Sequence, residues 1–170
     1  WAASGGGPAA LHFDTGMNRL GLAAADCAAA LAALGERPAL AMSHYASSEN
    51  PASAQNDRQT EAFRSIAKLL QNIPLSLSNS SGIFLDLKPW FDLARPGYAL
   101  YGGNPTPGRP NPMRAVVTLE APIVQTRSIG AGETVGYNAR WTAARPTRLA
   151  IIPVGYADGI PRGAKGADGK

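Results

Sequence analysis

Short apolar runs alternate with helix-like segments over the first two-thirds of the chain, and this alternation limits the possible folds more than any other feature. We predict strands at residues 9–13, 39–45, 75–77 and 91–93, most of them followed by small polar residues. Helices are predicted at 23–34, which Gly35 ends, at 57–71, which precedes Pro74, and in a short segment up to Lys88. Strands joined by helical crossovers indicate parallel α/β structure, in which chemistry gathers on the loops after the strands.

The sequence changes character after Tyr101. Residues 102–112 are dense in Gly, Pro and Asn, which is typical of a linker. Runs of β-type residues follow at 115–119, 123–126 and 148–154. We therefore predict a parallel α/β domain over residues 1–104, a linker over 105–112, and the start of a β-rich domain over 113–170.

Composition excludes several classes of function. The net charge is +4 and the 16 Lys and Arg residues are scattered, so a nucleic-acid partner is not implied. A single cysteine, Cys27, excludes an internal disulfide and a cysteine-based zinc site, and we expect it to be a small buried apolar side chain. No apolar run is long enough to span a bilayer, so no membrane partner is expected. Because residue 1 is Trp and not Met, we expect the true N-terminus to be absent.

Two segments are candidate phosphate sites. Residues 78–82 (SNSSG) follow a predicted strand and open a predicted helix, so backbone N–H groups and the helix dipole favour a phosphate there. The alternative is an ordinary helix N-cap. Gly97, after the next predicted strand, is the second candidate because a glycine lets the backbone approach a ligand closely.

Three basic side chains also stand at predicted strand ends. Arg95 needs an acceptor because it stays protonated, and it either binds a ligand or forms an internal salt bridge with Asp92. Arg19, on the loop that begins at Asp14, either clamps a carboxylate or is simply solvated. His44 is either a proton relay or a hydrogen-bonded core histidine.

The triplet Asp14-Thr15-Gly16 after an apolar pair resembles the catalytic loop of one class of enzyme, the aspartic proteases. Their catalysis needs two such carboxylates that share one proton, and this chain has one copy, so a homodimer would be required. The alternation of strands and helices argues against this interpretation.

Tyr137 and Tyr156 each stand beside a glycine in the predicted β-rich domain. The ordinary role of such a tyrosine is packing in a hairpin or core. Because a free tyrosine has a pKa of ~10, a role as a base near neutrality requires nearby positive charge or hydrogen-bond donors.

Six segments, in order along the chain, closely resemble signatures of the alanine racemase family. They are 11–21 (LHFDTGMNRLG), 42–46 (MSHYA), 77–82 (LSNSSG), 95–102 (RPGYALYG), 132–139 (GETVGYNA) and 155–159 (GYADG). The similarity extends from about Leu11 to Arg162, which is nearly the whole chain.

The resemblance implies the second half of a (β/α)8 barrel that binds pyridoxal 5'-phosphate, followed by the beginning of a β-rich domain. It also implies a homodimer in which each active site is completed by the β-rich domain of the partner. By the same resemblance, Tyr137 is the catalytic tyrosine and His44 supports it, while Arg19 holds the substrate carboxylate near the phenolic oxygen of the cofactor. Arg95 faces the pyridine nitrogen, Tyr156 lines the substrate entrance, and the phosphate is held by Asn79, Ser80, Gly97 and Tyr98.

The activity implied is the interconversion of L-alanine and D-alanine in the cytoplasm, which supplies D-alanine for peptidoglycan. Racemisation moves protons on both faces of a planar carbanion and so needs two opposed acid–base groups, of which Tyr137 is one. Arg95, which stays protonated, donates a hydrogen bond but no proton, which keeps the cofactor ring a weaker electron sink.

The sequence also departs from the family pattern. The lysine that carries the cofactor would lie upstream, later motifs would lie beyond Lys170, and His12 stands where some relatives have a modified lysine. We therefore expect an internal fragment that does not racemise by itself. The alternatives are a serine or broad-specificity racemase and a non-catalytic barrel protein that binds the same cofactor. The latter lacks a β domain, which residues 132–137 argue against.

Overall fold

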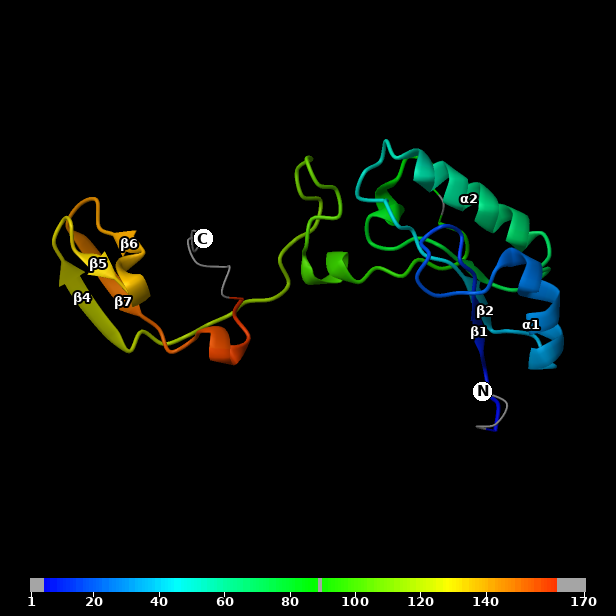
Figure 1. Ribbon diagram of the computed structural model, residues 1–170, viewed down its shortest axis with the longest axis horizontal. Coiled ribbons are helices and arrows are strands. Elements are labelled where there is room, and N and C mark those ends of the chain that lie inside the picture. The colour runs from blue at the N-terminus through cyan, green and yellow to red at the C-terminus, as the bar shows by residue number, and fades with distance from the viewer. Residues whose placement is uncertain (1–4, 89, 162–170) are drawn as a thin grey trace. The chain divides into compact units, whose positions relative to one another are not determined.

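A parallel sheet of three strands organises the first of the two units into which the chain divides, Trp1–Val117 and Thr118–Lys170. The structure, a computed structural model, describes residues 5–88 and 90–161. Strands β1 (Ala10–His12), β2 (Leu40–Met42) and β3 (Leu75–Ser76) lie in that order in the sheet, and helices α1 (Cys27–Leu34) and α2 (Ala54–Ala67) connect them (Figure 1). The predicted parallel α/β arrangement is confirmed for these elements.

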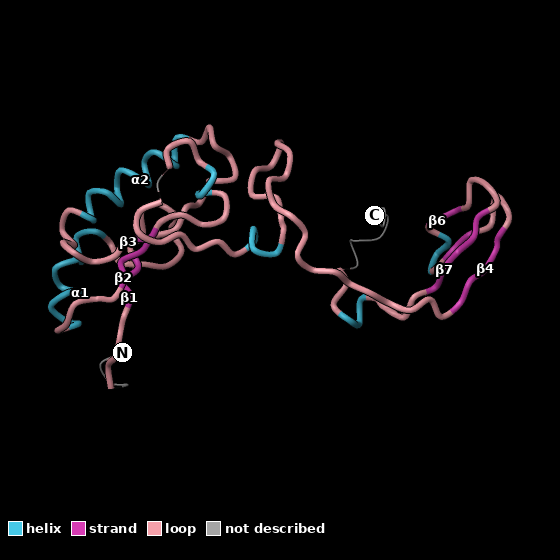
Figure 2. The backbone as a smooth tube through the Cα atoms, turned by 180° about the vertical axis from the view of Figure 1, so that it is seen from behind, coloured by secondary structure: helices cyan, strands magenta, loops and turns pink. Residues whose placement is uncertain are grey.

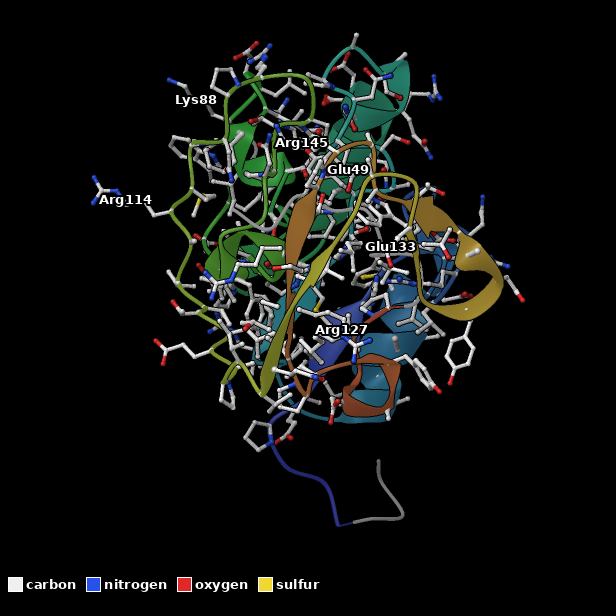
Figure 3. All side chains as sticks on the ribbon, turned by 90° about the vertical axis from the view of Figure 1, so that its left-hand side faces the viewer. Glu49, Lys88, Arg114, Arg127, Glu133 and Arg145 are labelled. Carbon is white, nitrogen blue, oxygen red and sulfur yellow. The ribbon has the colours of Figure 1, made fainter. Side chains whose placement is uncertain are left out.

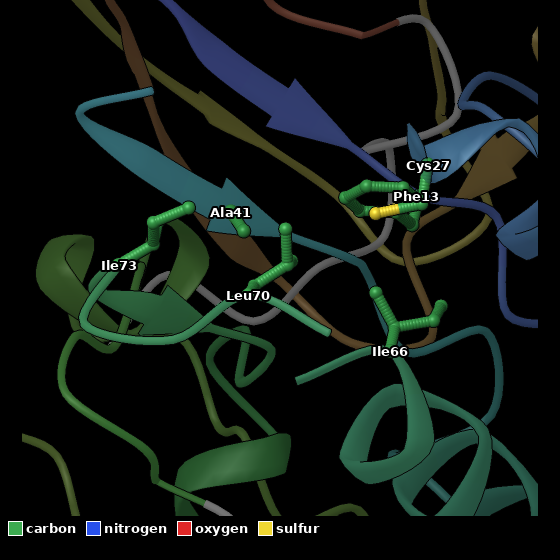
Figure 4. Close-up of a cluster of buried hydrophobic side chains, with 6 residues drawn as sticks. All are labelled: Phe13, Cys27, Ala41, Ile66, Leu70 and Ile73. Carbon is green, nitrogen blue, oxygen red and sulfur yellow. The ribbon is translucent and has the colours of Figure 1, made fainter. Parts of the chain in front are cut away.

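The two faces of the sheet differ in chemistry because successive strand residues point to opposite sides. Leu11, Ala41 and Leu75 are in register across the three strands and pack towards the helices. This side forms an apolar core around a cluster that spans the sheet and both helices: Phe13, Cys27, Ala41, Ile66, Leu70 and Ile73 (Figure 4). Cys27 is 2% exposed, so its prediction as a buried apolar side chain is confirmed. The next register row, His12, Met42 and Ser76, points to the opposite face.

Local signals set the limits of both helices. Helix α1 ends at Gly35, which adopts a left-handed φ of 69° and donates its N–H to the Leu31 carbonyl. Helix α2 begins at Ala54, earlier than predicted, because the Ser53 side chain accepts a hydrogen bond from the Gln55 N–H and caps the helix. The short helix predicted up to Lys88 is only a 3-10 turn, Gly82–Phe84.

The fourth predicted strand, at residues 91–93, is wrong. Two side chains take the groups that a regular ladder would use: the Asp92 carboxylate accepts the Leu75 N–H at 2.8 Å, and the Ser76 hydroxyl donates to the Leu93 carbonyl at 2.6 Å. Phe91 also has a left-handed φ of 51°. The segment therefore follows β3 through irregular contacts, including one from the Arg95 N–H to the Ser78 carbonyl.

Residues 102–115, which include the predicted linker, fold back on themselves in a closed loop. Gly102 has a φ of 84°, and a Cβ there would lie 2.6 Å from the Arg114 carbonyl oxygen. The Asn111 side chain donates to the Gly102 carbonyl, and Pro105 is fully buried. Both ends of the loop thus lie side by side within the first unit.

The second unit is β-rich, as predicted. Strands β4 (Gln125–Ile129) and β7 (Thr147–Ile151) pair antiparallel, and β5 (Thr134–Val135) pairs with β6 (Trp141–Thr142) (Figure 2). The predicted run at 115–119 is not a strand, because none of the described strands lies beside it to take its backbone groups. Val116, Val117 and Leu119 are accordingly 66 to 70% exposed.

None of the helices in residues 5–88 and 90–161 is both long and apolar enough to cross a membrane, and the longest of them, α2, has 14 residues.

The loop after β1 closes through Gly21. Leu22 returns beside Phe13 and exchanges backbone hydrogen bonds with His12 and Asp14. Gly21 has a φ of 127°, and a Cβ there would lie 2.6 Å from the Asp14 backbone nitrogen. A side chain at Gly21 would therefore push the loop away from the strand.

We predict that Gly21→Ala in the complete protein lowers the free energy of unfolding by about 3 kcal/mol or more, from backbone strain plus the clash. Gly35→Ala is the matched control, because Gly35 also has a positive φ but a Cβ there meets nothing within 4 Å. The control should cost only about 1 kcal/mol for the left-handed conformation. Denaturant unfolding measures both, and equal losses would contradict the role of close approach at Gly21.

Candidate functional site

Arg95 is the centre of a polar cluster at the carboxyl ends of the parallel strands. Its guanidinium donates to the Ser76 hydroxyl, to the Ser43 carbonyl at 2.6 Å, and to Nδ1 of His44 at 3.3 Å. Within residues 5–88 and 90–161 no carboxylate lies within salt-bridge distance of it. The predicted alternative, an Arg95–Asp92 salt bridge, is wrong because Asp92 accepts the Leu75 N–H instead.

The environment of Arg95 differs from that of the surface charges. Six charged side chains labelled in Figure 3 are all exposed: Glu49, Lys88, Arg114, Arg127, Glu133 and Arg145. Arg95 is only partly exposed, and burial lowers its pKa from the ordinary value. A partly buried cation with no described counter-charge favours a ligand that carries an acceptor or negative charge.

His44 is held as a neutral ring. Burial lowers its pKa, and the positive charges of Arg95 and Arg19 lower it further. Because a guanidinium can only donate, Nδ1 of His44 accepts from Arg95, and we assign the ring hydrogen to Nε2. Nε2 lies 3.4 Å from the Asn79 amide nitrogen. Both groups carry hydrogen in this tautomer, so this is a close contact and not a hydrogen bond.

Asn79 fixes the loops after β2 and β3. Its side-chain oxygen accepts from the Gly82 N–H at 2.9 Å and from the Ser48 hydroxyl at 2.8 Å, while its amide donates to the Tyr45 carbonyl. A Cβ at Gly82 would lie 2.8 Å from the Tyr45 ring, so this turn needs a glycine. The N-cap alternative for residues 78–82 thus fits Asn79, which caps a turn.

Ser80 connects this turn to the segment after Arg95. Its hydroxyl oxygen accepts from the Gly97 N–H at 3.0 Å and the Ala99 N–H at 3.1 Å, so its own proton is left to be donated. A Cβ at Gly97 would meet nothing within 4 Å, so this glycine borders open space. Tyr98, next to it, is 62% exposed, and its ring lies against Gly103.

The prediction of a helix dipole at residues 78–82 is wrong. The elements that begin at Gly82 and Tyr98 are 3-10 turns of three and four residues, too short for an appreciable dipole. Any anion bound here would depend on side-chain and single backbone donors.

Asp14 organises the loop that carries Arg19. Its carboxylate accepts the backbone N–H groups of Gly16, Met17 and Asn18, and these hydrogen bonds, that of Gly16 first, lower its pKa. The carboxylate thus serves to shape this loop, and it lies in a parallel α/β unit, whereas aspartic proteases are mostly β and need two such carboxylates. The aspartic protease interpretation is therefore wrong.

Arg19 is exposed on this loop, and its charge acts on both histidines. Burial lowers the pKa of His12, and Arg95 and Arg19 lower it further, as they do for His44. The strand ends therefore carry a positive field that favours an anionic ligand such as a phosphate.

Tyr137 and Tyr156 belong to the second unit, and the structure does not place them relative to the cluster in the first. Tyr137 begins a 3-10 turn, Tyr137–Ala139, after β5, and is 93% exposed. Tyr156 begins a similar turn, Tyr156–Asp158, and is 71% exposed. Neither ring is buried in the core of its own unit.

Sequence reasoning missed the residues that hold Arg95 and His44 in place. Ser43 and Ser76 are buried and bind the guanidinium, and Gln59 of α2 binds the backbone of His44. Ser76 is a polar side chain that follows an apolar residue in a buried strand, which is a signal for a buried hydrogen-bond partner. Ser43 accepts through its backbone carbonyl and Gln59 lies in a largely polar helix, so neither carries such a signal.

These features define a class of protein: a parallel α/β unit with a positive polar cluster at its strand ends, followed by a separate β-rich unit. Two family models match the chain, the alanine racemase N-terminal domain over residues 2–105 and the alanine racemase C-terminal domain over residues 116–169. The chain belongs to the alanine racemase family.

Individual relatives agree with this assignment. The chain is 55% identical over 162 residues to an alanine racemase of Methylobacterium nodulans, covering 94% of this chain and 44% of that protein. It is 51% identical over 163 residues to an alanine racemase of Acidiphilium cryptum, again covering 44% of that protein. The chain thus spans less than half the length of the curated relatives it matches.

Solved structures confirm the predicted fold, the second half of a (β/α)8 barrel followed by a β-rich domain. An alanine racemase of Bartonella henselae with covalently bound pyridoxal phosphate has a TM-score of 0.74 at 40% identity, over 91% of this chain and 44% of that one. The alanine racemase of Streptomyces coelicolor has a TM-score of 0.83 at 31% identity, over 99% of this chain and 50% of that one.

We predict that Asp14 makes stability depend on pH in the acid range. Its pKa lies below the ordinary value of 3.8, so its contribution is complete above that value and is lost as pH falls through the lower, folded pKa. Asp14→Asn keeps an acceptor but has no charge to lose. The difference in free energy of unfolding between the native protein and Asp14→Asn should be constant near neutrality and shrink in acid. A difference that does not change with pH would contradict this.

Proposed function

We propose that the complete protein interconverts L-alanine and D-alanine with pyridoxal 5'-phosphate. The observation that carries the proposal is Arg95, a partly buried cation without a described carboxylate partner, held by Ser43 and Ser76 against the neutral ring of His44. The relatives named alanine racemase, one of them solved with covalently bound pyridoxal phosphate, support the same activity.

The residues present fit this cofactor. The Ser80 hydroxyl has a proton to donate, Gly97 borders open space, and the cluster is positive, so a phosphate suits this part of the site together with Asn79 and Tyr98. Arg95 uses only part of its donor capacity on Ser43, Ser76 and His44, which leaves N–H groups for a pyridine nitrogen. When bound, the cofactor withdraws electrons from the substrate Cα so that its proton becomes removable.

The chain's own residues would bind the substrate and move the proton. Arg19, exposed on the loop after β1, would hold the alanine carboxylate, and Tyr156 would line the entrance. The Tyr137 phenol would exchange the α-proton on one face of the substrate. Tyr137 is 93% exposed, so its ring is available to reach a site on another subunit. His44 would support the phenol through its Nε2–H.

We further propose that the complete protein is a homodimer with active sites shared across the interface, and that it works in the cytoplasm, where D-alanine supplies peptidoglycan synthesis. The exposure of Tyr137 and the resemblance to the family support the first point, and the bacterial relatives support the second.

We predict that Tyr137→Phe in the complete protein abolishes racemisation in both directions, because each direction needs proton transfer on both faces of the substrate, while the visible absorbance of the bound cofactor persists. The substitution removes the phenolic proton carrier and leaves the strand-end cluster intact. Chiral chromatography of both reactions measures the effect. Unchanged turnover in both directions would refute the role of Tyr137, and a complete protein that neither binds the cofactor nor racemises alanine would refute the proposed function.

We predict that Ser80→Ala weakens cofactor affinity by about 10–100-fold, because a hydrogen bond to a charged group contributes about 1.5–3 kcal/mol. Ser81→Ala is the matched control, since Ser81 is similarly buried but Gly97 and Ala99 bind Ser80. Titration of the cofactor-free protein, followed by absorbance, gives both dissociation constants. Equal affinities in the two variants would exclude Ser80 from the phosphate site.

A further inference from the structure

Gln59 is a fully buried polar residue in the middle of helix α2, with 1% of its surface exposed. All of the bonds that its side chain makes lead to the loops after β1 and β2. The amide nitrogen donates to the His44 carbonyl at 2.9 Å and to the Thr15 hydroxyl at 3.2 Å, and the amide oxygen accepts from the Ala46 N–H at 2.9 Å. Burial of an amide is unfavourable unless such bonds are made, so this residue ties α2 to both loops.

The first effect of these bonds is to fix the backbone on both sides of the His44–Tyr45 step. The carbonyl of His44 and the N–H of Ala46 are both held by one rigid side-chain amide. Among the described residues, the ring of His44 has two long polar contacts, 3.3 Å from Nδ1 to the Arg95 guanidinium and 3.4 Å from Nε2 to the Asn79 amide nitrogen. Only the first is a hydrogen bond, and because its length is near the limit for such a bond, a backbone shift of about 0.5 Å would break it.

The second effect runs through the loop after β1. The Thr15 hydroxyl that Gln59 binds lies 2.7 Å from the Ser43 hydroxyl, and the Ser43 carbonyl accepts from the Arg95 guanidinium. Gln59 thus connects, through Thr15 and Ser43, to the same guanidinium that faces His44. Gln55, one turn earlier on α2, holds Gly16 and Ser47 at the outer parts of the same loops.

We propose that Gln59 is a positioning residue for His44 and Arg95 in the racemisation. It touches neither cofactor nor substrate and acts by setting the place of the His44 ring relative to the guanidinium. This inference rests on the proposed function for its kinetic consequence, but its structural part concerns only residues of this chain.

The test uses the complete, cofactor-loaded protein with Gln59→Met, which fills a similar volume and removes all three hydrogen bonds. Thr60→Val is the matched control: Thr60 is the next residue of α2, is 3% exposed, and bonds to Tyr45 and Asn56 rather than to the His44 backbone. Both substitutions remove buried hydrogen bonds and should lower thermal stability. Only Gln59→Met should lower kcat, by about 10–100-fold as expected for a small misplacement of an active-site group, with little change in KM.

A spectroscopic readout separates positioning from general stability. Ring ¹⁵N shifts of His44, identified by the signal lost in His44→Gln, should report the Nε2–H form in the native protein and a mixture of both neutral forms in Gln59→Met. Thr60→Val should keep the native signal. If Gln59→Met keeps the native ring signal and loses kcat only in proportion to thermal stability, Gln59 is merely structural and the inference is overturned. If the native protein racemises no alanine, the proposed function fails, whereas the ring signal still decides whether Gln59 positions His44.

Discussion

The contact between Arg95 and the neutral ring of His44 is the interaction on which the rest of the strand-end cluster depends. A guanidinium cannot give up its charge, and here it is satisfied by a serine hydroxyl, a backbone carbonyl and an imidazole nitrogen and by no described carboxylate. Its charge therefore remains available and adds to burial, the larger cause, in lowering the pKa of both His44 and His12. A carboxylate at Asp92 that reached Arg95 would cancel this field, but that group is engaged by the backbone of β3.

The apolar side of the sheet makes such a polar arrangement possible. The cores formed around Phe13 and around Tyr45 and Phe63 attach α1 and α2 to one face of the strands. Helix α2 can then direct Gln55 and Gln59 to the strand-end loops, while the opposite register row contributes Ser76 beneath Arg95. Packing energy and site geometry therefore depend on the same elements and on different faces of them.

Elements set by neighbouring residues could be predicted from the sequence, whereas contacts between residues far apart in the sequence could not. The parallel strands, both helices and the positions of His44, Asn79, Ser80 and Arg95 at strand ends follow from apolar periodicity and from small polar residues after each run. The fourth strand could not be excluded in this way, because its loss depends on two side-chain contacts, from the Asp92 carboxylate to the Leu75 N–H and from the Ser76 hydroxyl to the Leu93 carbonyl. Each contact joins residues 17 positions apart, which local patterns do not reveal. Likewise, nothing in the spacing of Gln59 shows that its amide meets the His44 backbone, since that contact exists only after α2 has packed on the sheet.

The closed loop at residues 102–115 has a consequence for how this protein tolerates change. Because Gly102 lies directly against Arg114 and Ala115, the distance between the ends of the loop is set by that contact and not by the residues between them. Extra residues inserted near its tip, at Gly108, would add only the slowly growing entropy of a longer closed ring. Length variation among homologous chains, or an epitope tag introduced by design, is best accommodated at this point.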